Sequence, residues 1–242
     1  MDRATIDKLR NAKRVGVLTG AGISQESGVP TFRGKGGYWK NYKAEELATP
    51  EAFYRDPTLV WSWYNMRREV CLQAKPNPAH TIVAKMESFF SQFLLITQNV
   101  DNLHRRAGNK KIIEIHGNIF QAYCTHCRWN GALEQVPLQK VPPECPVCDT
   151  IIRPNIVWFG ETYDENKLHS CFQFLQNVEI IIIIGTSGQV SVPVRMAQYA
   201  MDNGAFSIEI NPDSSALSSQ VNVFIEERAG IALPALWEQV NS

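Results

Sequence analysis

Two pairs of cysteines have the spacing that most clearly indicates chemistry. Cys124 and Cys127 are followed by Cys145 and Cys148, which gives the pattern C-x2-C-x17-C-x2-C. Two short turns with this spacing can hold four thiolates around one zinc ion in tetrahedral geometry. Because four protein ligands leave the metal no open position, we predict one structural Zn²⁺ that stabilises a segment too small to build its own core.

A glycine-rich stretch near the N-terminus indicates a nucleotide site. The strand-like residues 15–18 are followed by TGAGISQESGVPTFRG over residues 19–34. Backbone N–H groups in such a turn can hold a pyrophosphate where a helix begins. Gly20 and Gly22 match the first two glycines of the dinucleotide fingerprint, but Gln25 occupies the third position, and no strand with a ribose-binding acid follows. An ordinary dehydrogenase therefore fits poorly, and a plain strand-to-helix turn is the alternative.

His116 is a candidate general base. It ends the strand-like sequence IIEIH and precedes Gly117. An imidazole with a pKa near neutral could deprotonate a sugar hydroxyl, although a histidine at a strand end is often a satisfied structural residue. Gln98, Asn99 and Asp101 follow another predicted strand. Their side chains suit binding an amide and ordering a ribose or a water, or they are simply turn residues.

These side chains need a sheet that brings them together. Short apolar runs predict strands at residues 14–18, 93–97, 112–116, 178–184, 206–210 and 222–225, and helical patterns predict helices at residues 78–90, 167–176, 192–202 and 233–240. This alternation predicts an α/β fold with a Rossmann-like, doubly wound parallel sheet. Ligands of such sheets bind beyond the carboxyl ends of the strands, where residues 19–33, 98–104, 185–187 and 211 are expected to form one cleft.

Two insertions predict a second, smaller domain over this cleft. Residues 40–74 are helical and rich in aromatic side chains, and residues 120–155 carry the four cysteines. The larger domain is then expected to comprise residues 1–39, 75–119 and 156–242, and both domains to form a single catalytic unit.

Composition restricts the partners. The sequence has 24 basic and 24 acidic residues, so no global field attracts nucleic acid. A nucleic-acid-binding zinc ribbon has little support, because Arg128 and Lys140 are the only Lys or Arg residues between the cysteine pairs. The first residues lack the apolar core of a secretory signal, and the strongly apolar run 180–184 is far shorter than the roughly 20 residues of a membrane helix. We expect neither nucleic acid nor a membrane as a partner.

The remaining cysteines bear on the cellular location. Cys71 and Cys171 stand apart from the quartet, and this usage fits a reducing compartment with metal ligation better than a disulfide framework. The cytoplasm is therefore the expected location, with the mitochondrial matrix as the alternative. The sequence does not fix the oligomeric state, for which a monomer is plausible.

Several motifs occur in the order seen in sirtuins. They are TGAGIS…GVPTFRG, TQNVDNLH, the dipeptide His116-Gly117, the cysteine quartet, GTS at 185–187 and EIN at 209–211. The chain resembles this family over nearly its whole length. The resemblance implies an NAD-dependent protein lysine deacylase, with NAD as co-substrate, acyl-lysine proteins or peptides as substrates and a small zinc-bearing domain. One departure is GTSGQVSVP, where Pro193 lies one residue later than in the family pattern and leaves the start of the next helix open.

The resemblance also implies roles for individual residues. His116 and Asn99 would be catalytic, with His116 as general base. The acyl-lysine carbonyl oxygen would attack C1′ of the ribose as nicotinamide leaves, and His116 would then promote attack by a ribose hydroxyl, giving O-acyl-ADP-ribose and free lysine. The residues implied to bind NAD are Gly20, Ala21, Gly22, Ile23, Thr31, Phe32, Arg33, Tyr38, Trp39, Gln98, Asn99, Val100, Asp101, Gly185, Thr186, Ser187, Asn211, Pro212, Asp213 and Ala229. The segment Val157, Trp158, Phe159 and Gly160 would pair with the substrate peptide as an added strand.

The acyl group is suggested by a tyrosine and an arginine. Tyr64 and Arg67 lie three residues apart on a predicted helix and therefore on one face, where a hydroxyl and a guanidinium could receive a carboxylate. The sirtuins that remove succinyl, malonyl and glutaryl groups carry Tyr-x-x-Arg here, and Ala44 resembles their small residue that leaves room for a longer acyl chain. We therefore expect acidic acyl groups to be preferred over acetyl. The alternatives are a general deacetylase, a non-catalytic NAD sensor and ADP-ribosyl transfer to protein.

Overall fold

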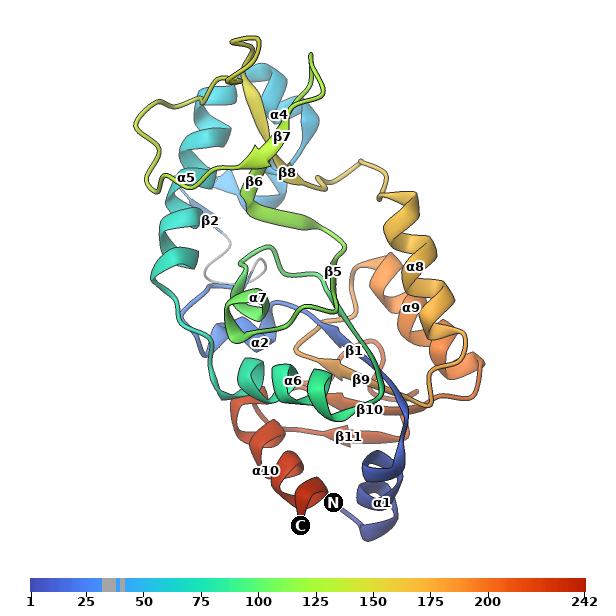
Figure 1. The fold of residues 1–242 in the computed structure, drawn as a ribbon. Coiled ribbons are helices and arrows are strands. Elements are labelled where there is room, and N and C mark those ends of the chain that lie inside the picture. The colour runs from blue at the N-terminus through green and yellow to red at the C-terminus, as the bar shows by residue number, and fades with distance from the viewer. Residues whose placement is uncertain (32–37, 40–41) are drawn as a thin grey trace.

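A parallel sheet forms the larger part of the molecule (Figure 1). The computed structural model describes residues 1–31, 38–39 and 42–242. Within them, six strands lie in the order β11-β10-β9-β1-β4-β5, and each pairs in parallel with its neighbours. The strands are β1 (Arg14–Thr19), β4 (Gln92–Thr97), β5 (Ile112–Glu114), β9 (Ile180–Ile184), β10 (Phe206–Ile210) and β11 (Val223–Ile225). The predicted Rossmann-like α/β sheet is confirmed.

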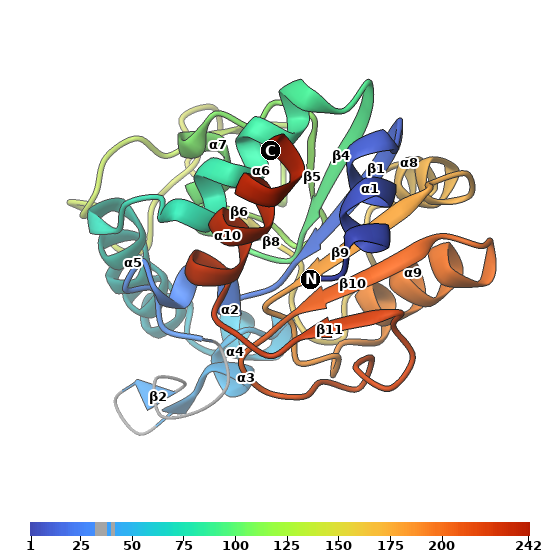
Figure 2. The ribbon, with the colours of Figure 1, turned by 90° about the horizontal axis from the view of Figure 1, so that it is seen from below.

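Helices cover both faces of this sheet (Figure 2). α1 (Arg3–Asn11), α6 (Pro78–Phe89) and α10 (Ala229–Asn241) contribute to one apolar core, and α8 (Glu165–Leu175) and α9 (Ser191–Asp202) contribute to the other. The five consecutive isoleucines of β9 are buried because alternate side chains enter opposite cores. This run therefore reads as continuous apolar sequence rather than as an alternation.

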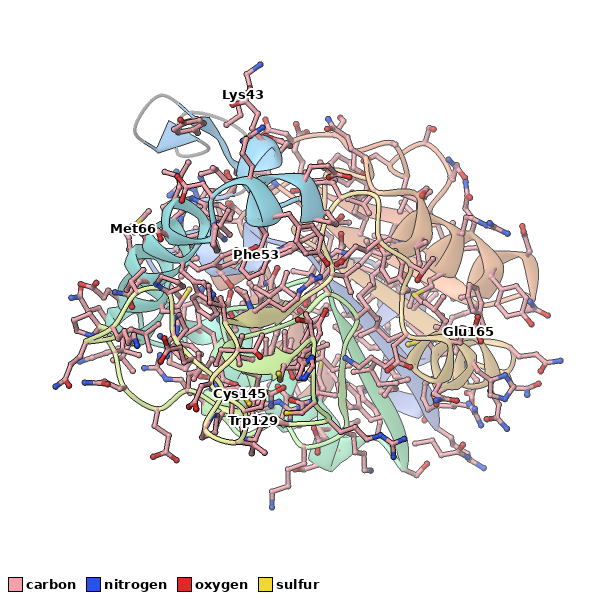
Figure 3. The ribbon with its side chains drawn as sticks, turned by 90° about the horizontal axis from the view of Figure 1, so that it is seen from above. Lys43, Phe53, Met66, Trp129, Cys145 and Glu165 are labelled. Carbon is pink, nitrogen blue, oxygen red and sulfur yellow. The ribbon has the colours of Figure 1, made fainter. Side chains whose placement is uncertain are left out.

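The smaller part packs three helices against a second sheet. α3 (Ala44–Leu47), α4 (Pro50–Arg55) and α5 (Pro57–Gln73) precede the antiparallel sheet β7-β6-β8, formed by β6 (Gly117–Cys124), β7 (Asn130–Ala132) and β8 (Ile152–Ile156). The two-residue strands β2 (Tyr38–Trp39) and β3 (Tyr42–Lys43) form a separate pair. Phe53 of α4 and Met66 of α5 belong to the same core as Cys145 and Trp129 (Figure 3).

Helix α5 is the element that joins the small part together. Asp56 caps its start by accepting a hydrogen bond from the Leu59 N–H, and Pro57 occupies the first turn. On its buried face, the Trp61 indole donates to the carbonyl of Ile152 over 2.7 Å. The Arg68 guanidinium donates to the carbonyls of Leu133 and Gln135. These hydrogen bonds connect the helix to the cysteine-bearing segment 120–155 at two places, one between the two cysteine pairs and one after the second pair.

Some elements differ from the sequence-based expectation. The strands of the smaller part, β2, β3, β6, β7 and β8, were not predicted. α10 begins at Ala229 and runs through Pro234, although the pattern predicts a start at residue 233, because Ala229, Ala232 and Leu233 pack into the sheet core. Pro193 lies in the first turn of α9, where a proline is tolerated, so the shifted proline does not displace the helix. In the described part of the chain, no helix is long and apolar enough to cross a membrane.

Candidate functional site

The glycine-rich turn after β1 packs directly on the turn after β9. The N–H of Gly22 donates to the carbonyl of Gly185 over 2.8 Å, and a Cβ added to Gly20 or Gly22 would lie 2.7 Å from atoms of Gly185. Gly185 itself has a φ of +61°. Side chains at these positions would separate the two turns. The helix that follows, α2 (Gly22–Gln25), is a single turn, so the expected nucleotide-binding helix is too short to contribute a substantial dipole.

A cavity of about 580 Å³ lies beyond the carboxyl ends of the strands. On the side of the large sheet, the cavity is lined by the turns after β1, β4, β5, β9 and β10. On the side of the small part, it is lined by α5 and the segment after β8. A volume of this size accommodates a nucleotide-sized ligand. The cavity is formed where the larger and smaller parts meet, as the sequence predicts for the cleft.

Most residues predicted for the site line this cavity. They are Gly20, Ala21, Gly22, Thr31, Tyr64, Arg67, Gln98, Asn99, Val100, Asp101, His116, Val157, Trp158, Phe159, Gly160, Gly185, Thr186, Ser187, Asn211, Pro212 and Asp213. Phe32 and Arg33 lie outside the described residues, and Tyr38 and Trp39 are described only as strand β2. The roles of all these residues stay predictions.

Three predicted residues lie elsewhere. Ile23 and Ala229 are buried in the core on the α10 side of the sheet and are not among the cavity lining. Ala44 is 2% exposed in the core of the small part, and it is Ala48 that lines the cavity. Both alanines belong to the sequence KAEELATP, four residues apart, but only Ala48 is among the residues that line the cavity. Ala44 therefore does not line the cavity, and its predicted role in admitting a long acyl chain stays a prediction.

Other lining residues were not predicted from the sequence. These residues are Ser24, Gln25, Val29, Pro30, Ala48, Cys71, Ile156, Glu161, Tyr163, Val190 and Ser214. The glycine-rich motif over residues 19–34 contains Ser24, Gln25, Val29 and Pro30. Their place in this motif could have identified them as residues of the site. Cys71 lies one helical turn after Arg67 and therefore on the same face of the helix, so its position could also have been predicted from the sequence. Tyr163 had no such signal.

Buried polar groups join the β1 and β4 turns at the base of the cavity. Asn99 donates through Nδ2 to the carbonyl of Gly20 over 3.0 Å and to Oγ of Ser24 over 3.2 Å. The Ser24 hydroxyl donates to the Asp101 carboxylate over 2.7 Å, and the Leu103 N–H donates to its other oxygen. Burial raises the pKa of Asp101, against these two hydrogen bonds. The network fixes the direction of the Asn99 amide.

Two buried histidines support this network from behind. The rings of His80 and His104 lie 4.7 Å apart. His80 approaches Ser24 Oγ through Nε2 at 3.4 Å, and His104 contacts the Thr19 hydroxyl through Nε2 at 3.0 Å. Burial lowers the pKa of His80 to about 4 and that of His104 well below its usual value. Both rings are therefore neutral near pH 7, and their positions are structural.

His116 lies between β5 and β6 with both ring nitrogens hydrogen-bonded. Nδ1 lies 2.9 Å from the carbonyl oxygen of Gln98, and Nε2 lies 3.0 Å from the hydroxyl of Tyr163. Burial lowers the pKa of His116, and the bond to the Gln98 carbonyl opposes this. Gly117 has a φ of +89°, and a Cβ there would lie 2.0 Å from the carbonyl oxygen of Asn155. Only glycine lets the chain turn next to His116.

Tyr64 and Arg67 extend into the cavity from α5. Tyr64 is 2% exposed, and its hydroxyl oxygen accepts a 2.8 Å hydrogen bond from the Trp158 indole. Burial raises the pKa of Tyr64 to about 12, although Arg67 nearby lowers it, so the phenol remains protonated and can donate. The Arg67 guanidinium lies 5.0 Å from the ring centre of Trp63. The structure thus brings the predicted tyrosine and arginine to the lining of one cavity.

The segment after β8 is held by its own backbone donors. The N–H groups of Val157 and Phe159 donate to the carbonyls of His116 and Ala48, each over 3.0 Å. The backbone N–H of Trp158 donates to the carboxylate of Glu161. This carboxylate also accepts hydrogen bonds from both terminal nitrogens of Arg153, at 2.7 and 2.8 Å. An added peptide strand could not use these three N–H groups and would depend on other groups, such as carbonyl oxygens.

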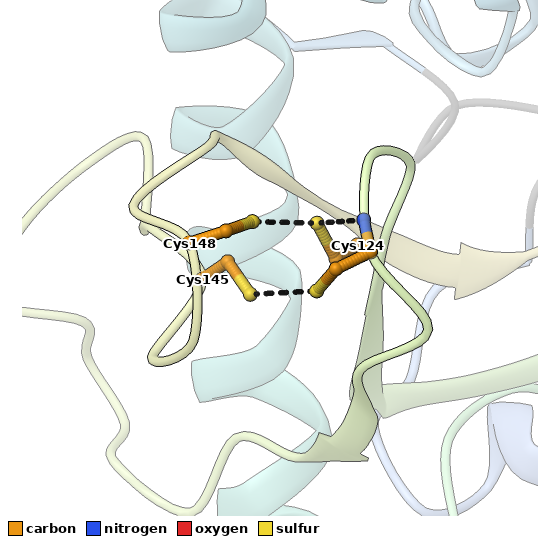
Figure 4. Close-up of side chains that lie close together, drawn as sticks. Cys124, Cys145 and Cys148 are labelled. Carbon is orange, nitrogen blue, oxygen red and sulfur yellow. Dashed lines mark hydrogen bonds between the residues drawn. The ribbon is translucent and has the colours of Figure 1, made fainter.

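The four cysteines of the small part lie close together, and Figure 4 shows Cys124, Cys145 and Cys148 of this group. Their Sγ atoms all lie within 4.8 Å of one another, and the pairs Cys124–Cys148 and Cys127–Cys145 are 3.5 Å apart. A tetrahedral zinc with Zn–S bonds of about 2.3 Å requires sulfurs about 3.8 Å apart, so the set fits the ion. N–H groups of His126 and Cys127 point at Cys124 Sγ over 3.3 Å, which suits a thiolate ligand.

Comparison with known proteins gives a consistent result. The model of the Sir2 family matches residues 20–192. A protein named NAD-dependent protein deacylase from Leptospira interrogans serogroup Icterohaemorrhagiae serovar Lai (strain 56601) is 46% identical over 232 residues, which cover 94% of this chain and 93% of that protein. A solved complex of a Sir2 homologue with NAD has a TM-score of 0.95 at 38% identity, covering 100% of this chain and 94% of that chain. A Sir2 complex with a p53 peptide and NAD⁺ has a TM-score of 0.89 at 30% identity, covering 100% and 99%.

Proposed function

The chain belongs to the Sir2 family and is an NAD-dependent protein deacylase, and we propose that it prefers acyl-lysines whose acyl group ends in a carboxylate. Its co-substrate is NAD, and it carries one zinc ion on the four cysteines. Succinyl, malonyl and glutaryl groups are the acyl classes that the proposal covers.

The observation that carries this preference is the hydrogen bond between Trp158 and Tyr64. Because the hydroxyl oxygen of Tyr64 accepts from the indole, its own hydrogen remains to be donated. The phenol lines the same cavity as the guanidinium of Arg67. A carboxylate at this end would accept from a neutral and a charged donor together. Hydrogen bonds that involve a charged group contribute about 1.5–3 kcal/mol, which corresponds to roughly 10-fold to 150-fold in kcat/KM.

Residues on the sheet side of the cavity would bind and activate the nucleotide. Bound NAD supplies a ribose whose C1′ loses nicotinamide. The N–H groups of Gly20 and Gly22 donate to the carbonyls of Ile184 and Gly185, so the glycine turn would bring its backbone close to the phosphates without using these two donors. Ser187 and Asn211 would hold the adenosine half. Asn99, oriented by Gly20 and Ser24, would position the nicotinamide ribose, and Asp101 the carboxamide. His116, buried and neutral, would take the proton of a ribose hydroxyl.

In the proposed function the zinc has a structural role and takes no part in the reaction. All four positions of a tetrahedral ion are filled by the cysteines, so no water or substrate can bind it. The ion would fix the cysteine-bearing segment against α5, the helix that carries Tyr64 and Arg67.

Nicotinamide release from NAD with matched succinyl-lysine and acetyl-lysine peptides tests the acyl preference. The wild-type protein should turn over the succinyl peptide with the higher kcat/KM, and Arg67→Met should lower this value at least 10-fold while sparing deacetylation. The exposed Arg195 of α9, replaced by Met, is the matched control and should change neither activity. Acetyl preference in the wild type would overturn the proposal, and equal loss of both activities in Arg67→Met would assign that arginine to the fold.

Three further expectations are kept as proposals. The six cysteines form no disulfide, which supports a reducing compartment such as the cytoplasm. Balanced charge supports the absence of a nucleic-acid partner. A monomer is proposed as the functional unit, as expected from the sequence.

A further inference from the structure

The hydroxyl of Tyr163 lies on the ring nitrogen of His116 that would meet the substrate. The oxygen is 3.0 Å from Nε2, and the two ring centres lie 5.5 Å apart at 48°. Tyr163 follows the 157–160 segment and precedes Asp164, which caps α8. Its ring packs against the core under α8, whereas its edge lines the cavity. Tyr163 therefore belongs both to this core and to the cavity that His116 lines.

The direction of this hydrogen bond follows from the other ring nitrogen. A carbonyl oxygen can only accept, so the contact with Gln98 requires the proton on Nδ1 of His116. In the neutral ring Nε2 then carries a lone pair, and the phenol donates to it. Burial lowers the pKa of His116 and raises the pKa of Tyr163, which keeps the imidazole neutral and the phenol protonated. The lone pair that a general base needs is thus already occupied.

The charged groups around the ring are engaged elsewhere. Glu114 of β5 pairs with Arg105 at 3.0 Å, and Glu161 pairs with Arg153. Lys167 of α8 donates to the carbonyl of Glu114, and Asp101 accepts from Ser24 and Leu103. Within the part of the chain that the structure describes, Tyr163 is the polar contact at Nε2.

We propose that Tyr163 is a positioning residue that caps the base lone pair of His116 until a ribose hydroxyl of the bound nucleotide replaces it. The inference rests on the proposed function, in which His116 is the general base. On replacement the ribose O–H transfers its proton to Nε2, giving an imidazolium whose Nδ1–H still donates to Gln98. Tyr163 leaves with its own proton, so it takes no part in the transfer. The cap holds the ring in the productive tautomer and keeps water from Nε2 before substrate arrives.

Tyr163→Phe removes the cap and preserves the packed ring. Without a donor to the neutral form, the pKa of His116 should rise by about half to one pH unit, as measured by histidine NMR titration of the ligand-free protein. The acid limb of kcat/KM against pH should shift upward by the same amount. On the alkaline plateau kcat/KM should rise about 2-fold to 10-fold, because the ribose hydroxyl no longer competes with the phenol. Because the same free energy sets both changes, the two pH profiles should converge at acid pH and separate above the pKa of His116.

Two variants separate the hydroxyl from the fold. Tyr163→Leu, which also loses the ring, should reproduce the pH shift but lower the Tm. Tyr199→Phe on α9, whose ring packs edge-on against Phe172 at 5.2 Å, should change neither the profile nor the titration. An unchanged His116 pKa in folded Tyr163→Phe, or a uniform fall in rate at every pH, would overturn the cap.

Failure of the proposed function gives a different result. If His116→Ala retained deacylation, the general-base assignment would be wrong, whereas the titration of His116 in Tyr163→Phe would still report whether the phenol binds Nε2. An upward shift of that titration with no change in the kinetic profile would refute the capping role and leave the hydrogen bond as a structural contact.

Discussion

The indole of Trp158 donates a 2.8 Å hydrogen bond to the hydroxyl oxygen of Tyr64. The two residues lie 94 positions apart, and both are 2% exposed. Trp158 belongs to the segment proposed to meet the substrate peptide, and Tyr64 to the helix proposed to meet the acyl group. This contact joins the two segments that are proposed to form the substrate site.

Tyr64→Phe should therefore affect both specificity and stability. The substitution removes a donor to the acyl carboxylate, so kcat/KM for a succinyl peptide should fall at least 10-fold, and more than for an acetyl peptide. It also leaves the buried indole N–H without an acceptor, which should lower the free energy of unfolding by about 1–3 kcal/mol. Urea unfolding and paired peptide assays measure the two effects. Tyr54→Phe, at a tyrosine that is 77% exposed, should show neither, and an unchanged succinyl-to-acetyl ratio in Tyr64→Phe would contradict the prediction.

Ala48→Leu and Ala44→Leu should separate the cavity from the core. Ala48 belongs to the core of the small part but also lines the cavity, so a larger side chain there should reduce kcat/KM for succinyl, malonyl and glutaryl peptides more than for acetyl. Ala44 is buried in the small-part core, where overpacking costs typically about 1–3 kcal/mol. Its variant should lower the Tm and leave the acyl ratio unchanged. The reverse pattern would restore Ala44 as the residue that admits long acyl chains.

Zinc removal should disable the acyl end of the site. The cysteine-bearing segment is bound to α5 through Trp61 and Arg68, so its loss of order should disturb Tyr64 and Arg67. Chelation should abolish deacylation together with the near-UV circular dichroism of the tryptophans, and added zinc should restore both. Elemental analysis should give about one zinc per chain. Cys148→Ser should lose the metal, whereas Cys171→Ser, buried in the core under α8, should retain it. Full activity without metal would refute this dependence.

Stability should fall in mild acid because of His80. Burial holds its pKa at about 4 in the folded protein, below the ordinary 6.5 of the unfolded chain. As the pH falls, His80 therefore takes up its proton in the unfolded state before it does so in the folded state. The stability that the neutral, buried His80 contributes is complete above pH 6.5 and is lost as the pH falls from 6.5 towards 4. The loss should reach about 3 kcal/mol, measured by urea unfolding at a series of pH values. His104, whose pKa is also lowered, should add to it.

His80→Asn tests the assignment. The amide cannot titrate, so this variant should be less stable at pH 7 but should lose less stability between pH 7 and pH 4. The exposed His169 of α8, replaced by Asn, should follow the wild-type profile. A His80→Asn profile parallel to that of the wild type would place the acid sensitivity elsewhere.

Local patterns predicted much of the fold. The strands β1, β4, β9 and β10 have apolar sequences because helices bury both faces of the sheet. Helix α6 begins where the sequence has Asn77 as a cap and Pro78 in the first turn. β6 was missed because its burial does not alternate, and the start of α10 was misplaced because tertiary packing carries the helix through Pro234. In each miss the deciding contact comes from residues far away in the sequence.

The sequence by itself determined the chemistry available to this protein: four thiolates with zinc spacing, a glycine turn after a strand, and the order of motifs that the Sir2 family shares. These are properties of residue type and spacing. Only the tertiary structure decided which side chains meet. It placed Ala48 rather than Ala44 in the cavity, buried Ile23 and Ala229 in the core, and set the phenol of Tyr163 on His116. The physical reason is that side-chain direction and burial are set by packing between distant segments, which no local pattern records.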